Sequence, residues 1–358
     1  MRLAIAWKAL SECPSHRVLL DILAEEHNHR LLALIEGEMP TEGISPEITC
    51  HPARTLHFGH PTLDLLSGWM EAFNQFSPEV LLAFYEPYSL QATVFSKWAI
   101  KRKIPIIFLS CQNIDRKFPL PFCWMEKSCL SHAQGGWFLN REAAQRARKR
   151  GFRGVEAVIP LGVPKELFDF PIRKYDSASS LKVGFVGRLV PEKGVEDLFA
   201  ACAQITCVAH IAGEGPFRPE LESLAARLGL SVAWHGHITG QALLDFYRTI
   251  EVLVLPSRTT PTWKEQFGRV LAEAMAAGVP VIGSSSGEIP NVIGSVGLIF
   301  REGDVSSLVQ RLNQIQEKPQ LVSRLASAGR ARAQFCFTWE KVADSLNGLI
   351  HRTYGDMG

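Results

Sequence analysis

The sequence predicts an α/β protein made of two domains, each with a parallel sheet covered by helices. Short apolar runs of strand length alternate along the chain with longer stretches of helical character. The chain has 358 residues, which is enough for two domains of ordinary size. Residues 166–180 lose this periodicity and end in a small polar run, which is typical of a linker. We therefore expect domains at 1–165 and 181–337.

The first domain is expected to contain five buried strands and four helices. The strands are predicted at 2–7, 31–36, 80–84 and 104–109, and residues 155–163 are predicted as a last strand followed by a turn. The helices are predicted at 15–26, 63–76, 90–101 and 140–150. Strands that are joined through helices run parallel, and ligands of such sheets bind beyond the carboxyl ends of the strands. The loops after residues 84 and 109 are therefore the places to look for a site.

Polar side chains follow both of these strands. Glu86 follows strand 80–84, and the adjacent amides Gln112 and Asn113 follow strand 104–109. One interpretation is that all three contact a substrate. The other is that Glu86 caps the helix starting near Ser89, while the two amides satisfy the backbone of a turn. Both interpretations stay open at this stage.

Two further segments of the first domain have the composition of contact surfaces. The aromatic and proline-rich loop 118–122, together with Trp124, suits a sugar face, a lipid or local packing. Residues 140–153 include a helix with several Arg and Lys residues, which suits peripheral contact with anionic lipid at the inner membrane face. A plain solvated face is the simpler interpretation of that helix.

Composition excludes several classes of protein. A net charge of +2 provides no electrostatic reason to expect nucleic acid as a partner. The eight cysteines include no CxxC pair, so reduced thiols in the cytosol are expected rather than zinc or disulfides. The opening MRLAIAWKAL has too short an apolar run for a signal peptide, and no stretch has the length and hydropathy to span a bilayer. We expect a cytoplasmic protein.

The second domain repeats the alternation of strand and helix. Strands are predicted at 181–187, 210–213, 232–236, 252–255 and 279–283. Helices are predicted up to about residue 203, up to 228, and at 243–249, 267–277 and 338–354.

Two cations flank the turn after the first of these strands. The strand ends at Gly187, and Arg188 and Lys193 follow within the string GRLVPEKG. Cations at the carboxyl end of a strand can clamp a diphosphate, arginine with bidentate geometry and lysine as a point charge. An Arg and a Lys near a turn are also common as ordinary surface residues.

Two carboxylates bracket the start of the helix at 267–277. Glu265 lies just before the helix N-terminus, where unpaired N–H groups favour anions, and Glu273 lies about two turns further along. Gly268 removes a side chain where a ligand approaches the backbone. This arrangement suits a ligand with hydroxyls at both ends and a phosphate between them, such as a sugar nucleotide. The alternative is that Glu265 only complements the helix dipole and that Glu273 is an ordinary solvated residue.

The string LPSRTTPTWKEQFGRVLAEAMAAGVPV, which holds both glutamates, resembles the donor-site signature of family 4 glycosyltransferases. The resemblance covers most of the C-terminal half and extends more loosely to the N-terminal half. It implies the GT-B fold, in which two Rossmann-like domains face each other across a cleft. It also implies that the last segment, 338–358, is a helix that crosses back to pack on the N-terminal domain.

The resemblance implies a retaining transfer of a sugar from a nucleoside diphosphate sugar to a hydroxyl group. In that scheme the departing phosphate takes the acceptor proton, and Arg188, Lys193 and Glu265 carry the catalytic roles. Glu265 would bind hydroxyls of the donor sugar, and Glu273 those of the ribose. The full set of expected donor-binding residues is Gly187, His237, Phe267, Gly268, Arg269, Val270 and Glu273. No Asp-x-Asp pair is present, so neither a metal nor another cofactor is expected.

The chain departs from the family pattern at two places in its N-terminal half. Residues 110–113 contain no histidine and residues 8–16 no glycine, where many members carry them. The expected acceptor is a glycan or lipid-linked glycan, in cell-surface polysaccharide or glycolipid synthesis, with Glu86, Gln112 and Asn113 on the acceptor side. The alternatives are a non-catalytic partner protein that binds nucleotide sugars, or another GT-B enzyme such as an epimerase or a phosphorylase.

Overall fold

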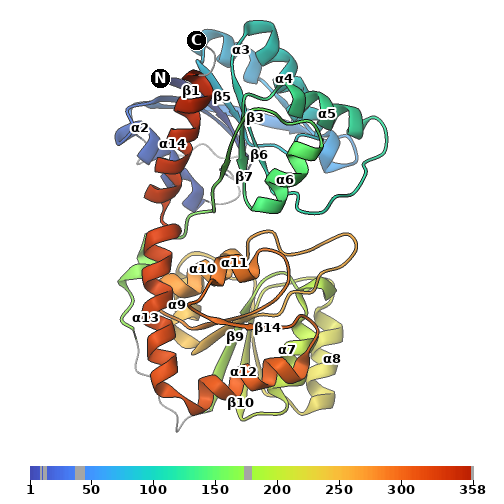
Figure 1. Ribbon diagram of the computed structural model, residues 1–358, viewed down its shortest axis with the longest axis vertical. Coiled ribbons are helices and arrows are strands. Elements are labelled where there is room, and N and C mark those ends of the chain that lie inside the picture. The colour runs from blue at the N-terminus through green and yellow to red at the C-terminus, as the bar shows by residue number, and fades with distance from the viewer. Residues whose placement is uncertain (9, 11–13, 37–44, 173–179, 356–358) are drawn as a thin grey trace. The chain divides into compact units, whose positions relative to one another are not determined.

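The computed structural model describes residues 1–8, 10, 14–36, 45–172 and 180–355. The chain divides into two compact units (Figure 1). Unit 1 comprises residues 1–162 and 339–358, and unit 2 comprises residues 163–338. Both units combine helices with a mostly parallel sheet, so the predicted α/β class is confirmed.

Unit 1 is built on an eight-stranded sheet with the order β4-β3-β2-β1-β5-β6-β7-β8. Neighbouring strands are parallel except for β3 and β4, which are antiparallel. The strands are β1 (Arg2–Ala6), β2 (Arg30–Glu36), β3 (Ile48–Leu56), β4 (Leu65–Ser67), β5 (Val80–Ala83), β6 (Ile106–Ser110), β7 (Gly135–Phe138) and β8 (Val155–Val158). The direction of winding reverses between β1 and β5, and parallel sheets bind ligands at such a reversal.

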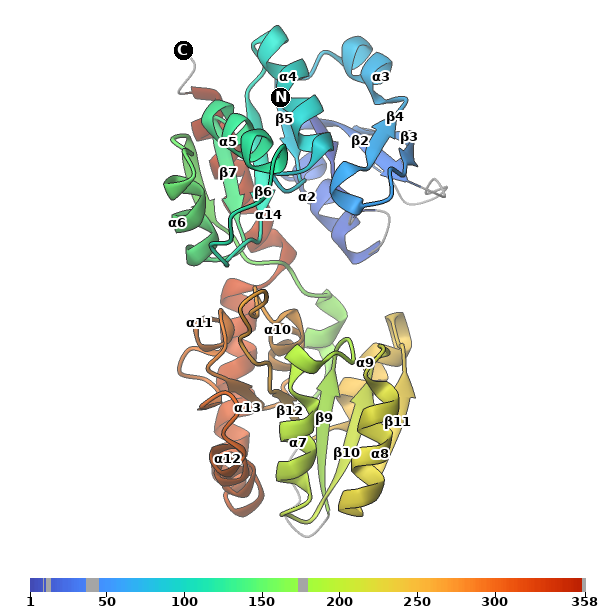
Figure 2. The same ribbon diagram turned by 90° about the vertical axis from the view of Figure 1, so that its right-hand side faces the viewer.

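Helices cover both faces of this sheet (Figures 1 and 2). One apolar cluster lies beneath α2 and α14, and the other lies beneath α3, α4, α5 and α6. The helical elements are η1 (Pro14–Arg17), α2 (Val18–Glu25), η2 (Pro61–Leu63), α3 (Trp69–Phe76), α4 (Leu90–Arg102), α5 (Phe122–His132), α6 (Arg141–Lys149) and α14 (Trp339–Gly355).

The C-terminal helix α14 belongs to unit 1, although unit 2 precedes it in the chain. Its residues Val342, Leu346 and Leu349 are buried in the cluster that contains Leu3 of β1. A Cβ atom at Gly162 would lie 2.3 Å from the indole of Trp339, at the start of α14. A side chain is therefore excluded at position 162, where the chain leaves unit 1.

One prediction for unit 1 was wrong, and three further elements, β3, α5 and β7, were missed. The single helix expected at 63–76 is instead η2, β4 and α3, because Gly68 adopts a φ of 84° before α3 and β4 pairs with β3. Strand β3 was missed because its burial is irregular and Pro52 lies in its middle. Helix α5 and strand β7 were missed as well, since α5 has no regular apolar periodicity and β7 begins with two glycines.

Unit 2 contains a six-stranded parallel sheet with the order β11-β10-β9-β12-β13-β14. Its strands are β9 (Leu181–Val186), β10 (Cys207–Ala212), β11 (Val232–Gly236), β12 (Val252–Leu255), β13 (Val281–Ser284) and β14 (Leu298–Phe300). Its helical elements are η3 (Lys165–Asp169), η4 (Pro191–Lys193), α7 (Val195–Cys202), α8 (Arg218–Leu228), α9 (Gly240–Thr249), α10 (Arg269–Ala276), α11 (Ile289–Ile293), α12 (Val305–Glu317) and α13 (Pro319–Cys336). The winding reverses between β9 and β12.

The expected linker at 166–180 is in part folded. Residues 165–169 form η3, which lies against α10, and Leu167 and Phe170 are buried in unit 2. Residues 173–179 of this expected linker lie outside the described residues. The chain passes from unit 1 to unit 2 between Gly162 and Val163.

Candidate functional site

In unit 2 the predicted donor-site residues other than His237 lie around the point where the sheet reverses. The loop 187–194 follows β9, and the loop 256–268 follows the neighbouring strand β12. Adjacent parallel strands bring the loops at their carboxyl ends together, so residues far apart in the sequence meet here. The helix α10 begins at the end of the second loop, where Gly268 adopts a φ of 77°.

The structure pairs two of the predicted catalytic residues with each other. The Lys193 Nζ lies 2.7 Å from the Oε2 atom of Glu265, and both side chains are largely buried. The hydroxyl of Ser257 donates to the same oxygen at 2.9 Å. Lys193 Nζ also lies 4.8 Å from the ring centroid of Trp263. Since an ammonium group has three donors, this ion pair leaves Lys193 able to contact a further anion.

A second arginine, which the sequence analysis did not identify, holds the Lys193 turn in place. The backbone N–H of Arg258 donates to the carbonyl of Glu192 at 2.8 Å, and its Nε donates to Asp197 at 2.7 Å. The hydrogen bond with Asp197 raises the pKa of Arg258 above its ordinary value. A Cβ atom at Gly194 would lie 2.2 Å from the carbonyl oxygen of Pro256. The two loops are thus in direct backbone contact, which only a glycine at 194 permits.

The other expected catalytic cation, Arg188, is exposed at the end of β9. Among the residues that the structure describes, its side chain makes no ion pair. The preceding residue, Gly187, donates its N–H to the carbonyl of Ala212 at 3.0 Å, which joins the end of β9 to the end of β10. His237 is also exposed and follows β11, at the edge of the sheet.

The two glutamates of the E-x7-E string have different surroundings. Glu273 is only 2% exposed, so the alternative that it is an ordinary solvated residue was wrong. The hydroxyl of Tyr247 donates to its Oε2 at 2.7 Å, and the Nε of Arg269 lies 3.0 Å from its Oε1. Burial and the nearby carboxylate raise the pKa of Tyr247 well above its ordinary value, so the phenol stays a donor. Both oxygens of Glu273 are therefore held in a fixed orientation.

The remaining predicted residues lie at the mouth of α10. Phe267 is buried against the ring of Phe337, at a centroid distance of 5.7 Å. Val270 is partly buried in the first turn of the helix, beside Arg269. The first turn of an α-helix presents unpaired N–H groups. Together with Lys193 they make this part of unit 2 suitable for an anion.

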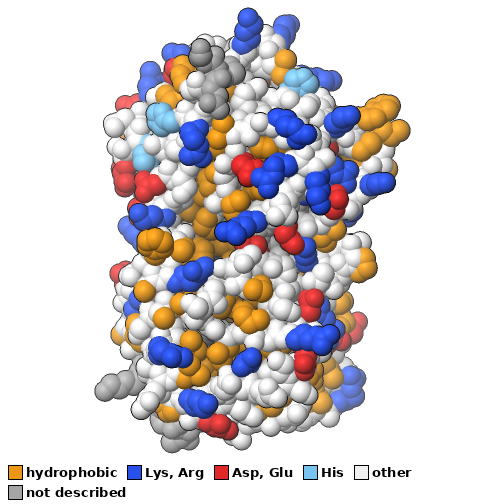
Figure 3. Space-filling model, in the orientation of Figure 1, with side chains coloured by type: hydrophobic (Ala, Val, Ile, Leu, Met, Phe, Trp, Pro, Cys, Tyr) orange, Lys and Arg blue, Asp and Glu red, His pale blue; other side chains and the backbone are white. Residues whose placement is uncertain are grey.

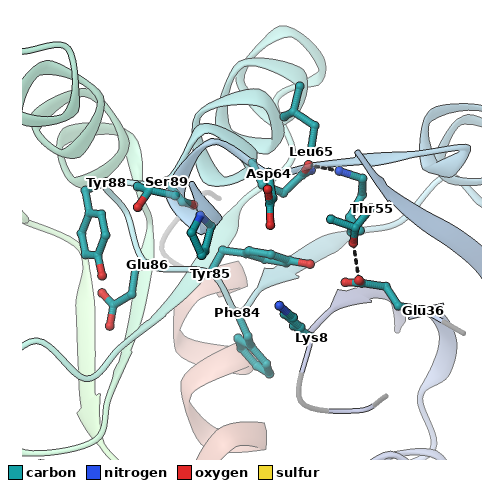
Figure 4. A pocket seen from close by; sticks show the side chains of 14 residues that line it. Lys8, Glu36, Thr55, Asp64, Leu65, Phe84, Tyr85, Glu86, Tyr88 and Ser89 are labelled. Carbon is teal, nitrogen blue, oxygen red and sulfur yellow. Dashed lines mark hydrogen bonds between the residues drawn. The ribbon is translucent and has the colours of Figure 1, made fainter. Parts of the chain in front are cut away.

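Unit 1 has a cavity of about 270 Å³ where its own sheet reverses, between β1 and β5 (Figure 4). Lys8 follows β1, Glu36 ends β2, and Tyr85 and Glu86 follow β5. Figure 4 shows Glu86 and Tyr88 on one side, Thr55 and Glu36 on the other, and Tyr85 and Lys8 between them. The lining residues are Lys8, Glu36, Thr55, Pro61, Thr62, Asp64, Leu65, Leu66, Phe84, Tyr85, Glu86, Tyr88, Ser89 and Gln91.

The alternative that Glu86 caps a helix was wrong. Helix α4 is capped by Ser89, whose hydroxyl accepts from the Ala92 N–H at 3.2 Å. The carboxylate of Glu86 instead accepts from the hydroxyl of Ser110 at 2.7 Å and from the N–H of Cys111 at 2.8 Å. Burial raises the pKa of Glu86 to about 7, against the effect of these hydrogen bonds. Near neutral pH this group therefore exists in both protonation states.

The two candidate amides have different positions. The Nε2 of Gln112 donates to the hydroxyl of Tyr88 at 3.1 Å, so Gln112 lies beside a residue of the cavity wall. Asn113 is buried and does not line the cavity. The structure thus brings Glu86 and Gln112 into one neighbourhood and leaves Asn113 outside it.

The two surface segments of unit 1 make more local contacts than their composition indicated, through ion pairs of the basic helix and packing of the aromatic loop. Arg146 is buried in an ion pair with Glu126 at 2.7 Å, and Arg150 pairs with Asp115 at 2.7 Å. Figure 3 shows Lys and Arg side chains over this part of the surface interspersed with Asp and Glu. The ring of Phe118 stacks on Tyr88 with a centroid distance of 4.3 Å, so this part of the aromatic loop packs locally.

Two features of the described residues bear on cofactors and membranes. In these parts of the chain no three His, Cys, Asp or Glu side chains are placed to hold a metal ion together. None of the helices that the structure describes has both the length and the hydropathy to cross a bilayer.

Comparison with known proteins identifies a family model that matches residues 172–332 and relatives that match about half of the chain. Residues 172–332 match the family model described as "Glycosyl transferases group 1". A "GDP-mannose-dependent monoacylated alpha-(1-6)-phosphatidylinositol monomannoside mannosyltransferase" of Corynebacterium glutamicum is 28% identical over 209 residues, which are 54% of this chain and 55% of that protein. A "D-inositol 3-phosphate glycosyltransferase" of Streptomyces griseus is 31% identical over 190 residues, 48% of this chain and 39% of that protein. The chain thus spans about half the length, or less, of these two relatives.

Solved structures are similar over nearly the whole chain. A sucrose-phosphate synthase from Thermosynechococcus elongatus has a TM-score of 0.77 at 20% identity, covering 99% of this chain and 100% of the other. Anabaena Alr3699/HepE in complex with UDP has a TM-score of 0.76 at 18% identity, covering 98% and 100%. At such identities the likeness establishes the fold alone, and the predicted GT-B fold is confirmed.

Proposed function

We propose, because residues 172–332 match the family model of the group 1 glycosyltransferases, that the protein transfers a sugar from a nucleoside diphosphate sugar to a hydroxyl group. The C1–O bond to the diphosphate breaks, and a new bond from C1 to the acceptor oxygen forms on the same face of the sugar. The proton of the acceptor hydroxyl passes to an oxygen of the departing phosphate. The configuration at C1 is retained, and no side chain acts as a nucleophile.

The observation that carries this proposal is the contact between Lys193 and Glu265 at the mouth of α10. An ammonium group, the exposed guanidinium of Arg188 and the N–H groups after Gly268 supply positive charge from three elements. A diphosphate gains charge as it departs, and preorganised donors stabilise that charge most in the transition state. This positive charge comes from the chain's own groups, so we propose a metal-independent reaction.

The two glutamates take different parts in donor binding. Glu265, held by Lys193 and Ser257, accepts hydrogen bonds from hydroxyls of the donor sugar. Glu273 accepts from the ribose hydroxyls, and Tyr247 and Arg269 hold its carboxylate in position. Fixing both ends of the donor leaves the diphosphate near the cations and supplies catalysis by orientation.

The names of similar proteins narrow the substrate class. One relative is a GDP-mannose-dependent enzyme that acts on a phosphatidylinositol mannoside, another is named for inositol 3-phosphate, and one solved structure contains UDP. We therefore propose GDP- or UDP-activated hexose as the donor, and a glycan or glycolipid as the acceptor. Synthesis of cell-surface polysaccharide or glycolipid in the cytoplasm, at the inner membrane face, fits such substrates.

Thermal unfolding of the protein with UDP, GDP or ADP tests the donor site directly. A nucleotide present at 100 times its Kd stabilises the folded state by about 2.7 kcal/mol. For a domain of this size that raises the melting temperature by roughly 5–10 °C. Arg188→Ala should raise the nucleotide concentration needed for the same stabilisation roughly tenfold or more. The matched control is Arg227→Ala, an exposed arginine in the last turn of α8.

The outcomes of this experiment separate the candidate functions. A shift with one nucleotide that Arg188→Ala reduces and Arg227→Ala preserves supports the proposed site and names the donor class. Equal shifts in all three proteins would place the nucleotide elsewhere and refute this site. NMR of the product of the reaction with the corresponding nucleotide sugar then reads the configuration at C1, and an inverted product would refute the retaining mechanism.

A further inference from the structure

The C-terminal helix α14 is held against the rest of unit 1 in part by a buried histidine, His29. Helix α14 packs on α2 (Figure 1), and beside this contact His29, directly before β2, is 1% exposed. The Nε2 of His29 lies 2.8 Å from the Oδ1 of Asn347, in α14, so it carries the ring proton and donates. The Nδ1 of His29 is buried and has no hydrogen-bond partner among the residues that the structure describes. A second proton on this ring would therefore be buried without an acceptor.

The same asparagine joins His29 to a second histidine. The Nδ2 of Asn347 lies 3.1 Å from the Nδ1 of His27, and an amide nitrogen only donates, so this nitrogen of His27 accepts. The oxygen and the nitrogen of one amide group are thus used at once, which fixes its orientation. In this arrangement both histidine rings are neutral, and α14 is docked through a bridge between them.

We propose that His29 is a pH sensor for the docking of α14. When the Nδ1 of His29 takes up a proton, the charged ring needs water or an acceptor. Because Asn347 contacts this ring and His351 lies beside it, water reaches the ring when this part of α14 moves away from β2. Acid thus loosens the C-terminal half of α14. This response lies in unit 1 and needs no nucleotide, so it does not depend on the proposed function.

The charges next to His29 oppose a proton on its ring. The rings of His27 and His351 lie 6.5 Å and 6.0 Å from that of His29, between centroids. Burial lowers the pKa of His29, the hydrogen bond with Asn347 acts against this, and the α-amino group of Met1 and the two neighbouring histidines lower the pKa further. These three groups are positive or become positive on acidification, so they oppose the second proton most at low pH.

The carboxylates of this region are placed elsewhere. The charged and titratable groups on the segments around His29 are the α-amino group of Met1, Glu25, Glu26, His27, Arg30, Glu47, Lys341, Asp344, His351 and Arg352. Asp344 lies 3.4 Å from the Nε2 of His27 and 3.8 Å from the Nζ of Lys341. Among the described residues, none of the carboxylates forms an ion pair with His29. A proton on His29 is therefore not compensated by a counter-charge.

The direction of the pH response follows from linkage between protonation and docking. The pKa of His29 in the docked state lies below its ordinary value of 6.5, so the docked state binds the proton less tightly than the undocked state. This contribution to docking is fully present above pH 6.5 and is lost as the pH falls through the lowered pKa. One proton taken up per opening event raises the opening equilibrium constant by up to about tenfold for each pH unit in this window.

Hydrogen exchange of the full chain, read by mass spectrometry from about pH 7.5 to about pH 5, tests this proposal. Protection factors divide out the pH dependence of intrinsic exchange. We expect the protection of peptides from residues 342–351 to fall by up to about tenfold per pH unit below about pH 6.5, while that of β5 stays constant. An NMR titration of the histidine C–H signals should show His29 protonating below its ordinary pKa. Constant protection of α14, or a His29 signal that titrates at or above 6.5, would overturn the proposal.

Two variants and one control assign the response to His29. His29→Gln keeps a side-chain donor for Asn347 but does not titrate, so the protection of α14 should no longer depend on pH. Asn347→Asp places a carboxylate beside the His29 ring, so it should raise the pKa of His29 and remove or reverse the loss of protection in acid. His132→Gln, at an exposed histidine of α5, should keep the response of the wild type.

Each variant can contradict the proposal by itself. A wild-type loss of protection in His29→Gln would show that another group senses the pH. The same loss in Asn347→Asp would show that protonation of His29 does not control α14, even if His29→Gln failed to fold. Loss of the response in His132→Gln would equally refute the assignment to His29.

Discussion

Removing the hydroxyl of Tyr247 isolates one hydrogen bond whose contribution can be worked out from the structure. Tyr247 is 1% exposed, Glu273 is 2% exposed, and their oxygens lie 2.7 Å apart. A hydrogen bond to a charged group contributes about 1.5–3 kcal/mol, and its loss leaves a buried carboxylate with fewer donors. Tyr247→Phe should therefore lower the free energy of unfolding of unit 2 by about 2 kcal/mol. In a domain of this size the melting temperature should fall by roughly 4–8 °C.

The assay for this prediction is a double-mutant cycle. Unfolding is measured for Tyr247→Phe, for Glu273→Gln and for the double variant, with Tyr354→Phe as a control at an exposed tyrosine. The two residues are in contact, so their effects should be non-additive by about 1–2 kcal/mol. Nucleotide stabilisation should also weaken in Tyr247→Phe, because Glu273 would lose its fixed orientation. Additive effects within about 0.5 kcal/mol, with unchanged nucleotide binding, would refute this account of Glu273.

Four further predictions concern turnover, pH, metal and the fold of unit 1. Arg188→Ala and Lys193→Ala should each lower kcat roughly 100-fold or more, because both stabilise the departing diphosphate; losses below about tenfold in steady-state kinetics would contradict this. Burial raises the pKa of Glu86 from 4.5 to about 7, so the folded state binds the proton more tightly and stability should fall as pH rises from 4.5 to 7. Glu86→Gln should make the free energy of unfolding, measured in denaturant titrations, depend less on pH. An unchanged dependence on pH would contradict the raised pKa of Glu86. EDTA should leave turnover unchanged, and activity restored only by added divalent metal would refute metal independence. Glu126→Gln should destabilise unit 1 by about 3–5 kcal/mol in urea unfolding, because it leaves Arg146 buried without its counter-charge. A free energy of unfolding in urea equal to that of the wild type would contradict this.

Much of the architecture was accessible from sequence because it depends on local periodicity. A continuous apolar run such as Val80–Ala83 favours a buried strand between helices, and this strand was predicted to within one residue. The elements that were missed lack such a signal. Strand β3 has irregular burial, and the single helix predicted over 63–76 is broken by Gly68, whose positive φ no periodicity reveals.

The same distinction between local sequence signals and long-range contacts applies to the candidate site. The candidate donor-site residues, including Lys193 and Glu265, were predicted from charged groups that follow a strand or precede a helix and from the resemblance of the strings around them to a known family. Their direct contact joins positions 72 residues apart and depends on β9 and β12 being neighbours in the sheet. The supporting residues Tyr247 and Arg258 were missed, since nothing in their local sequence separates them from ordinary surface positions.

The sequence by itself determined the α/β class, the number of domains and the chemical groups available to a ligand. These follow from short-range properties: apolar periodicity, the ends of strands and helices, and the charge of single side chains. Only the tertiary structure decided which groups are partners, as with Tyr247 and Glu273, and which buried donor has no partner among the described residues, as with the Nε2 of Gln91. Strand order and close packing set those pairings and the desolvation of each group, and both depend on parts of the chain that are distant in sequence.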